Sequence, residues 1–138
     1  MPFIDVPEVV RRRMSRIRKT GSKPEVLVRR VAHRLGYRFR INRRDLPGTP
    51  DIVFSSRGCV IFVHGCFWHQ HAGCPQATIP SVRQEYWLPK LERTKARDAV
   101  NLEALEAVGW RTLVLWECEL SDEDALAERL STFLDRDR

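Results

Sequence analysis

Three potential metal ligands fall within nine residues of the chain, in a segment rich in glycine and proline. Cys66, His71 and Cys74 are followed much later by Cys118, which comes just past a predicted strand. Two thiolates and an imidazole in one loop, with a distant third thiolate, suit a closed tetrahedral Zn²⁺ site. On spacing alone, His69 could take the place of His71. Free cysteine often serves as a small buried apolar residue, but this loop has no apolar periodicity that would bury its thiols.

A second group of residues could support hydrolysis of a phosphodiester. Asp51 follows Pro50 at the entry to a predicted strand, and His64 and His69 lie at and beyond the end of the next one. An acidic residue beside a strand end that offers a backbone carbonyl can hold Mg²⁺. Such a cation polarises a phosphoryl oxygen, and an imidazole can take the proton of the attacking water. Taken alone, Pro50-Asp51 more simply indicates a turn with a local side-chain hydrogen bond.

Several aromatic residues lie where the sequence offers no regular apolar pattern to pack them. Phe67 and Trp68 fall inside the proposed zinc loop, and Trp87 precedes a predicted helix. Apolar wedges near basic residues can insert between bases and unstack them, so we expect these rings outside the core. Packing beneath the loop is the alternative. Two other rings flank or lie in a strand and are expected in the core, namely Trp110 and Trp116.

The charge of the chain is unevenly distributed. The net charge is +6 over 138 residues, but residues 1–44 hold 14 basic and three acidic residues. Residues 1–21 are therefore expected to form a basic arm, and residues 22–138 a single domain. A basic face at one end predicts an oriented contact with a polyanion, most simply nucleic acid, with Arg12 and Arg16 among the phosphate contacts. A solvated arginine-rich helix is the alternative interpretation.

Length and hydropathy exclude other classes of protein. A chain of this length can bury a core without disulfides. No apolar run approaches the length of a membrane span, and the first residues lack the pattern of a secretory signal. We therefore expect a cytoplasmic, monomeric protein with reduced or metal-bound thiols. Cys59 opens an apolar strand and fits the role of a small buried residue.

The sequence predicts the order α-β-β-β-α-β-α. Helices are predicted over residues 22–35 and 121–134, and the first has the pattern of a capping box between Ser22 and Glu25. Between them, helical character resumes near residue 81, and a helix is predicted from residue 89 or 90 to 108. The predicted strands cover residues 37–42, 51–54, 59–64 and 111–116. A helix between the last two strands implies a parallel crossover. The fold class is therefore α/β, with a mixed sheet flanked by helices.

These motifs together resemble those of the very short patch repair (Vsr) DNA mismatch endonucleases, from about Arg13 to Cys118. Two blocks carry most of the resemblance: Leu46-Pro47-Gly48-Thr49-Pro50-Asp51-Ile52-Val53 and Val60-Ile61-Phe62-Val63-His64-Gly65-Cys66-Phe67-Trp68-His69. The resemblance implies a restriction-endonuclease-like core. It also implies that the substrate is double-stranded DNA, nicked on one strand 5′ of the thymine in a T·G mismatch.

The resemblance further implies a role for each site residue. Asp51 and the backbone carbonyl of Val63 would hold the catalytic Mg²⁺, and Glu25 would act through a metal-bound water. His69 would be the general base, with His64 near the scissile phosphate. The structural Zn²⁺ would be bound by Cys66, His71, Cys74 and Cys118. The residues that would enter the DNA beside the mismatch are Met14, Phe67, Trp68 and Trp87.

Two departures from the family pattern and two alternatives remain at this point. Val63 stands where the family often has threonine, and the loop from Cys74 to Tyr86 is unlike that of other members. One alternative is a nicking or restriction-type nuclease that acts on another DNA target. The other is a catalytically silent, zinc-containing DNA-binding module. Mismatch-repair proteins are possible partners, and the sequence does not identify them.

Overall fold

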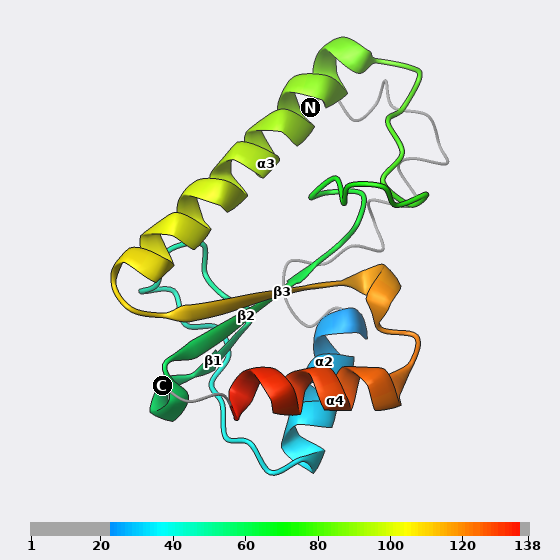
Figure 1. Ribbon diagram of the computed structural model, residues 1–138. Coiled ribbons are helices and arrows are strands. Elements are labelled where there is room, and N and C mark those ends of the chain that lie inside the picture. Colours follow the sequence, from blue (N-terminus) through cyan, green and yellow to red (C-terminus); the bar gives the residue numbers. More distant parts are fainter. Residues whose placement is uncertain (1–22, 136–138) are drawn as a thin grey trace.

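The computed structural model describes residues 23–135, which form three α-helices and a small sheet (Figure 1). The main elements follow the order α2 (Lys23–Arg34), β1 (Ile52–Phe54), β2 (Cys59–His64), α3 (Gln84–Ala107), β3 (Arg111–Trp116) and α4 (Glu123–Leu134). Short 3₁₀ segments cover Ser55–Arg57 and Glu117–Glu119. The predicted α/β class is therefore confirmed. The expected basic arm and Ser22 lie outside the described residues.

The three strands form one mixed sheet in the order β1-β2-β3. β1 and β2 are antiparallel, with Ile52 opposite Ile61, and the short segment between them makes a hairpin. β2 and β3 are parallel, with His64 opposite Trp116 at their carboxyl ends. The connection between these parallel strands runs through α3, as the sequence predicted. The carboxyl ends of β2 and β3 thus lie side by side, and the residues that follow them come together.

The predicted strand over residues 37–42 is not formed. Only one bridge exists there, between Arg40 and Val53, with two hydrogen bonds of 2.8 Å. Asn42 then adopts a left-handed conformation (φ 59°), which turns the chain away from β1. Tyr37 and Phe39 nevertheless pack edge-on against Phe54. The alternation of aromatic and basic residues thus reflects contact with the sheet edge, without a continuous hydrogen-bonded ladder.

Helices cover both faces of the sheet. α2 and α4 lie together on one face, over a core that contains Ile61 of β2 (Figure 1). α3 crosses the opposite face, where Val60 and Phe62 pack against Leu105. Successive side chains of a strand point to opposite faces, so the continuous apolar run of β2 fills both cores. This arrangement places β2, and the residues at its carboxyl end, at the centre of the molecule.

α3 begins between residue 81, where helical character was expected to resume, and residues 89–90, from which a helix was predicted. The helix starts at Gln84 and contains Pro89, so Trp87 lies within its first turns and does not precede it. Its inner face carries the buried Trp87, Leu91 and Leu105, whereas Val108, just past its last residue, is exposed.

The start of α4 also differs from the prediction in one residue. Its cap is Asp122 and not Ser121, because the Asp122 carboxylate accepts the backbone N–H groups of Asp124 and Ala125. No helix among residues 23–135 is long and apolar enough to cross a membrane.

Candidate active site and metal centre

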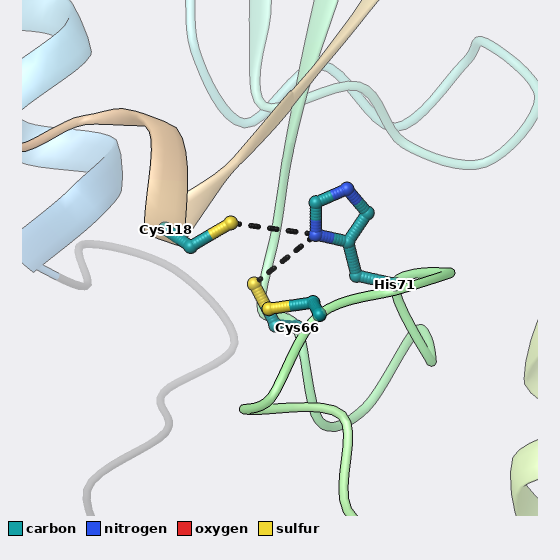
Figure 2. Close-up of side chains that lie close together, drawn as sticks. Cys66, His71 and Cys118 are labelled. Atoms are coloured by element: carbon teal, nitrogen blue, oxygen red, sulfur yellow. Dashed lines mark hydrogen bonds between the residues drawn. The ribbon is translucent and has the colours of Figure 1, made fainter.

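The four predicted ligands Cys66, His71, Cys74 and Cys118 come together in space. Their ligand atoms all lie within 4.8 Å of one another. The Nδ1 atom of His71 is 3.4 Å from the Cys118 sulfur and 3.7 Å from the Cys66 sulfur (Figure 2). Three thiols and one imidazole in such a group can hold a metal ion with no position left open, and this donor set suits a tetrahedral ion. The structure therefore selects His71, and not His69, for this group.

The loop around this group is held by its own backbone and by the segment after β3. The Cys66 carbonyl accepts the His71 N–H at 3.0 Å, and the His71 carbonyl accepts the Cys74 N–H at 3.2 Å. Glu117, beside Cys118, accepts the Cys66 N–H at 3.1 Å. Burial raises the pKa of the Cys66 thiol to about 12. A bound metal ion would have to offset the free-energy cost of deprotonating this thiol, since the thiolate is the form that binds metal.

Cys59 plays the part expected for a buried structural thiol. It lies in the core between the sheet, α2 and α4, and its sulfur donates to the Arg57 carbonyl at 3.2 Å. It takes no part in the cysteine and histidine group.

A second group of polar side chains consists of His64, His69 and Asp98. The His64 and His69 rings are stacked, with centroids 3.7 Å apart and planes 4° from parallel. His69 Nδ1 lies 2.6 Å from an Asp98 carboxylate oxygen. Burial, and to a lesser extent the charge of the neighbouring His69, lowers the pKa of His64 to about 4. His64 is therefore neutral near neutral pH. Two parallel imidazoles with a carboxylate on one of them form an arrangement that can accept and hold a proton.

Sequence reasoning missed Asp98, because it lies 29 residues from His69 on a different element. A signal was present in α3, whose inner face is defined by the buried Trp87, Leu91 and Leu105. Asp98 falls on that face at helical spacing from Leu91 and Leu105. An acidic residue on an otherwise apolar face that packs on a sheet requires a polar partner there.

Asp51 lies at the start of β1, beside both Val63 and Glu25. Its carboxylate accepts the Val63 N–H at 2.6 Å. Burial, opposed by this hydrogen bond and reinforced by Glu25, raises the pKa of Asp51 to about 7. Glu25, on α2, is only 4% exposed and pairs with Arg29 at 3.0 Å. Two buried carboxyl groups that face each other, with one arginine nearby, form a site that a cation would stabilise.

Val63 connects the two acidic residues to the histidines. A strand residue directs its N–H and C=O groups toward the same neighbouring strand, so the Val63 carbonyl lies on the Asp51 side of β2. The next residue is His64, which stacks on His69. Asp51, His64 and His69, three of the predicted catalytic residues, therefore lie around the carboxyl end of β2, with Glu25 beside Asp51.

Comparison with known proteins gives a consistent result. Residues 5–76 match the family described as DNA mismatch endonuclease Vsr. The chain is 54% identical over 129 residues to a type II nicking enzyme, V.XorIIP, of Xanthomonas oryzae, covering 94% of both chains. It is 37% identical over 130 residues to the DNA mismatch endonuclease Vsr of Escherichia coli, covering 88% of this chain and 83% of that one.

The chain belongs to the Vsr family. Its members are endonucleases, so the chain is a DNA-nicking hydrolase, and the alternative of a catalytically silent binding module is excluded. A further relative, the type II nicking enzyme V.NmeAIP of Neisseria meningitidis, is 41% identical over 118 residues, covering 86% of this chain and 84% of that one. A nuclease of this family implies a divalent metal ion, and the cysteine and histidine group could bind one.

Two of the three aromatic residues that were expected outside the core, ready to enter the DNA, are buried. Phe67 is 3% exposed and Trp87 is fully buried, and both pack with Leu91. Trp68 is half-buried at the edge of this cluster. The start of α3 at Gln84 explains the difference, because it brings the Trp87 ring under the loop. The other residues expected to contact DNA, namely Met14, Arg12 and Arg16, lie outside the described part of the chain.

Trp116 also differs from its expected place in the core. It is half-buried at the end of β3, and its ring stacks on His71 at 4.2 Å. Trp110, at the other end of that strand, is half-buried and packs against the core around Leu105 as expected, with the Arg43 guanidinium over its ring.

Proposed function

We propose that this Vsr-family chain nicks one strand of duplex DNA on the 5′ side of the thymine in a T·G mismatch. The observation that carries the proposal is the convergence of Asp51, His64 and His69 at the carboxyl end of β2. The mixed sheet would serve as a restriction-endonuclease-like core. Residues 1–21 would form a basic arm that contacts DNA, and residues 22–138 a single domain that acts as a monomer.

Asp51 and the Val63 carbonyl would hold Mg²⁺, with Glu25 beside them. The fit rests on the paired carboxyl groups, because burial and Glu25 raise the pKa of Asp51 and a cation would favour its charged form. Bound there, Mg²⁺ supplies positive charge that polarises the phosphoryl oxygen. The four ligands Cys66, His71, Cys74 and Cys118 would hold Zn²⁺, whose role would be structural, since they leave no position for a substrate.

His69 would act as the general base. A carboxylate only accepts hydrogen bonds, so His69 donates to Asp98 from Nδ1 and keeps Nε2 free to take a proton. A water oxygen bonds to phosphorus, the bond to the leaving sugar oxygen breaks, and the water proton passes to His69. His64, stacked on His69 and neutral, would lie against the scissile phosphate.

The test compares two labelled duplexes of equal sequence that differ only in T·G against T·A. With Mg²⁺, the wild-type protein should nick the T·G duplex on the thymine strand and leave the T·A duplex intact. Asp51→Ala should still bind the mismatch but nick it slower by orders of magnitude. Equal nicking of both duplexes would contradict the mismatch preference. Nicking by Asp51→Ala within about tenfold of wild type would contradict the metal assignment.

A second candidate is a nicking enzyme that acts on another DNA target. It is favoured by the 54% identical relative, which is named a type II nicking enzyme and not a mismatch endonuclease. The same experiment separates the two, because such an enzyme would nick a fully paired duplex at its own target sequence.

A further inference from the structure

The indole of Trp116 lies between the cysteine and histidine group and the histidine pair. It is stacked on His71, with centroids 4.2 Å apart and planes 8° from parallel. It also meets the His64 ring at 5.1 Å and 77°, in an edge contact. His69 lies 6.4 Å from it, again nearly perpendicular. One side chain thus contacts a ligand of the proposed zinc site and one of the two stacked histidines.

The sheet fixes this position. Trp116 and His64 are direct partners in the parallel pairing of β3 with β2, so their side chains leave the sheet on the same face. Glu119 accepts the Trp116 backbone N–H at 3.0 Å, which ties the end of β3 to the turn that carries Cys118. The backbone that carries the indole is therefore held by both β3 and the turn after it.

We propose that Trp116 is a positioning residue that holds the His64–His69 pair in its stacked geometry and couples it to His71. The buried His64 Nδ1 atom has no hydrogen-bond partner within residues 23–135. Its ring is therefore oriented by contacts with other rings, with His69 on one side and Trp116 meeting it edge-on. His69 is in turn held by His64 and by Asp98. A flat aromatic face at position 116 supports this series of rings, and an aliphatic side chain would leave His64 free to tilt.

His69 and His71 are joined by a single residue, which strengthens the coupling. Gln70 between them adopts a left-handed conformation (φ 48°), and its side chain donates to the Phe67 carbonyl at 2.6 Å. The two imidazoles therefore point into different groups while their backbones move together. Trp116 touches His71 directly and reaches His69 through His64, so a displacement of either histidine changes its contact with the indole.

The test replaces Trp116 with Leu, Met and Phe in the full-length, zinc-loaded protein, with Trp110→Leu as the matched control at the other end of β3. The nicking rate constant kcat and the KM for DNA are measured together. We expect Trp116→Leu and Trp116→Met to lower kcat by about tenfold or more at nearly unchanged KM, because small displacements of reacting groups are costly. Trp116→Phe should restore most of kcat, since phenylalanine keeps a flat ring. Trp110→Leu should leave kcat near wild type.

A second readout does not depend on activity. Transfer of zinc from the protein to a chelating dye should be about tenfold faster in Trp116→Leu than in wild type, the size of effect that residues behind a metal ligand have. If Trp116→Leu does not fold, Trp116→Met and Trp116→Phe carry the comparison. Wild-type kcat and zinc transfer in the Leu or Met variant would overturn the proposal. A raised KM at unchanged kcat would also overturn it, because Trp116 would then contact DNA.

The proposal rests on the role of His69 as the general base, and His69→Ala is assayed beside the other variants. Nicking by His69→Ala at the wild-type rate would show that the proposed catalytic assignment is wrong. Loss of nicking in His69→Ala with normal kcat in Trp116→Leu would leave that assignment in place and overturn the role of Trp116 alone.

Discussion

The carboxylate of Asp98 lies 2.6 Å from Nδ1 of His69, and this contact joins the middle of α3 to the loop that follows β2. Through this contact, Asp98 of the long helix α3 joins the group of residues around the end of β2. Because a carboxylate only accepts hydrogen bonds, the contact places the proton of a neutral His69 on Nδ1 and leaves a lone pair on Nε2. It therefore decides whether His69 can act as a base.

Asp98→Asn should lower the nicking rate with little change in DNA affinity. An amide can donate as well as accept, so it permits the other tautomer of His69, in which Nε2 carries the proton. We expect kcat to fall by about 100-fold or more while KM changes little. Glu103→Gln, an exposed acidic residue on the same helix, is the control and should be near wild type. A kcat for Asp98→Asn within a factor of about three would show that the pair does not orient the base.

Removal of Cys118 should cost stability as well as rate. Cys118 joins the loop after β2 to the end of β3, so a variant without it loses one of four ligands and the connection between two segments. We expect Cys118→Ala to lose about 4 kcal/mol or more of unfolding free energy and most of its zinc. Cys59→Ala, at a buried thiol outside the group, should keep one zinc per chain. A folded Cys118→Ala protein with the wild-type melting temperature would contradict a structural metal.

Asp51 should make the magnesium-free protein less stable as the pH rises. Its pKa is about 7 in the folded state, above the ordinary carboxyl value of 3.8. Between these values the folded protein keeps a proton that the unfolded chain has released, so unfolding free energy falls with increasing pH. Asp51→Asn has no such proton, and its stability relative to wild type should grow by at most about 1.4 kcal/mol per pH unit over this range. Thermal denaturation of the zinc-loaded protein without Mg²⁺, at several pH values, measures the difference.

The same pair of proteins tests the magnesium site. At pH 8, Mg²⁺ should raise the melting temperature of wild type and leave that of Asp51→Asn unchanged, because only the wild type has the charged ligand. Equal stabilisation of both would place the ion elsewhere.

Gly48 fixes the distance between the loop before Asp51 and α3. It has a positive φ of 76°, and a Cβ atom there would lie 2.9 Å from Cβ of Asn101. Gly48→Ala should therefore lower the unfolding free energy by about 2–4 kcal/mol, because alanine is strained at this φ and its Cβ would overlap Asn101. Gly58→Ala is the matched control, since Gly58 has a similar φ of 65° with nothing within 4 Å. Unfolding free energies are measured by denaturant titration. Equal decreases in the two variants would show that α3 moves at Asn101 to accommodate the added Cβ.

Alanine variants of Trp68 and Trp87 should distinguish a role in mismatch binding from a role in packing. Trp87 is fully buried, so Trp87→Ala should cost about 3–5 kcal/mol of stability. Trp68 is half-buried, and Trp68→Ala should mainly reduce the ratio of affinities for T·G and T·A duplexes, since unstacking is easier at a mismatch. Arg16→Ala, by contrast, should weaken both duplexes alike and flatten the salt dependence. If Trp68→Ala weakens both equally, its ring only packs the loop.

Apolar patterns predicted the central part of the fold. The runs in β1, β2 and β3 are short and continuous, and the intervening helical segment implied the parallel pairing that the structure has. The segment around Arg40 has the alternation of a strand, but backbone conformation at Asn42 decides where pairing stops, and side-chain types do not report it. The start of α3 lies between residue 81 and residues 89–90, because Pro89 is compatible with a helix near its first turns and does not mark its beginning.

The site could be predicted where its residues are close in sequence or carry rare chemistry. The thiols and His71 form one group as expected, and Asp51 lies beside Val63. Asp98 and Trp116 could not be assigned in this way, because their roles arise from the packing of α3 and β3 against β2. Their types are common in helices and strands, and only the three-dimensional arrangement gives them polar or aromatic partners. The burial of Phe67 and Trp87 has the same origin.

The separation of Cys118 from Cys66, His71 and Cys74 has a consequence for protein synthesis. Chains emerge from the ribosome with the amino-terminal part first, so the first three ligands emerge before β3 and Cys118 do. Until then the loop has an incomplete set of donors, and β2 lacks its parallel neighbour. A polypeptide that ends between Asp98 and Cys118 would contain Asp51, His64, His69 and Asp98 but would lack the last thiol of the cysteine and histidine group. The order of the ligands along the chain thus makes completion of this group one of the last steps of folding during synthesis.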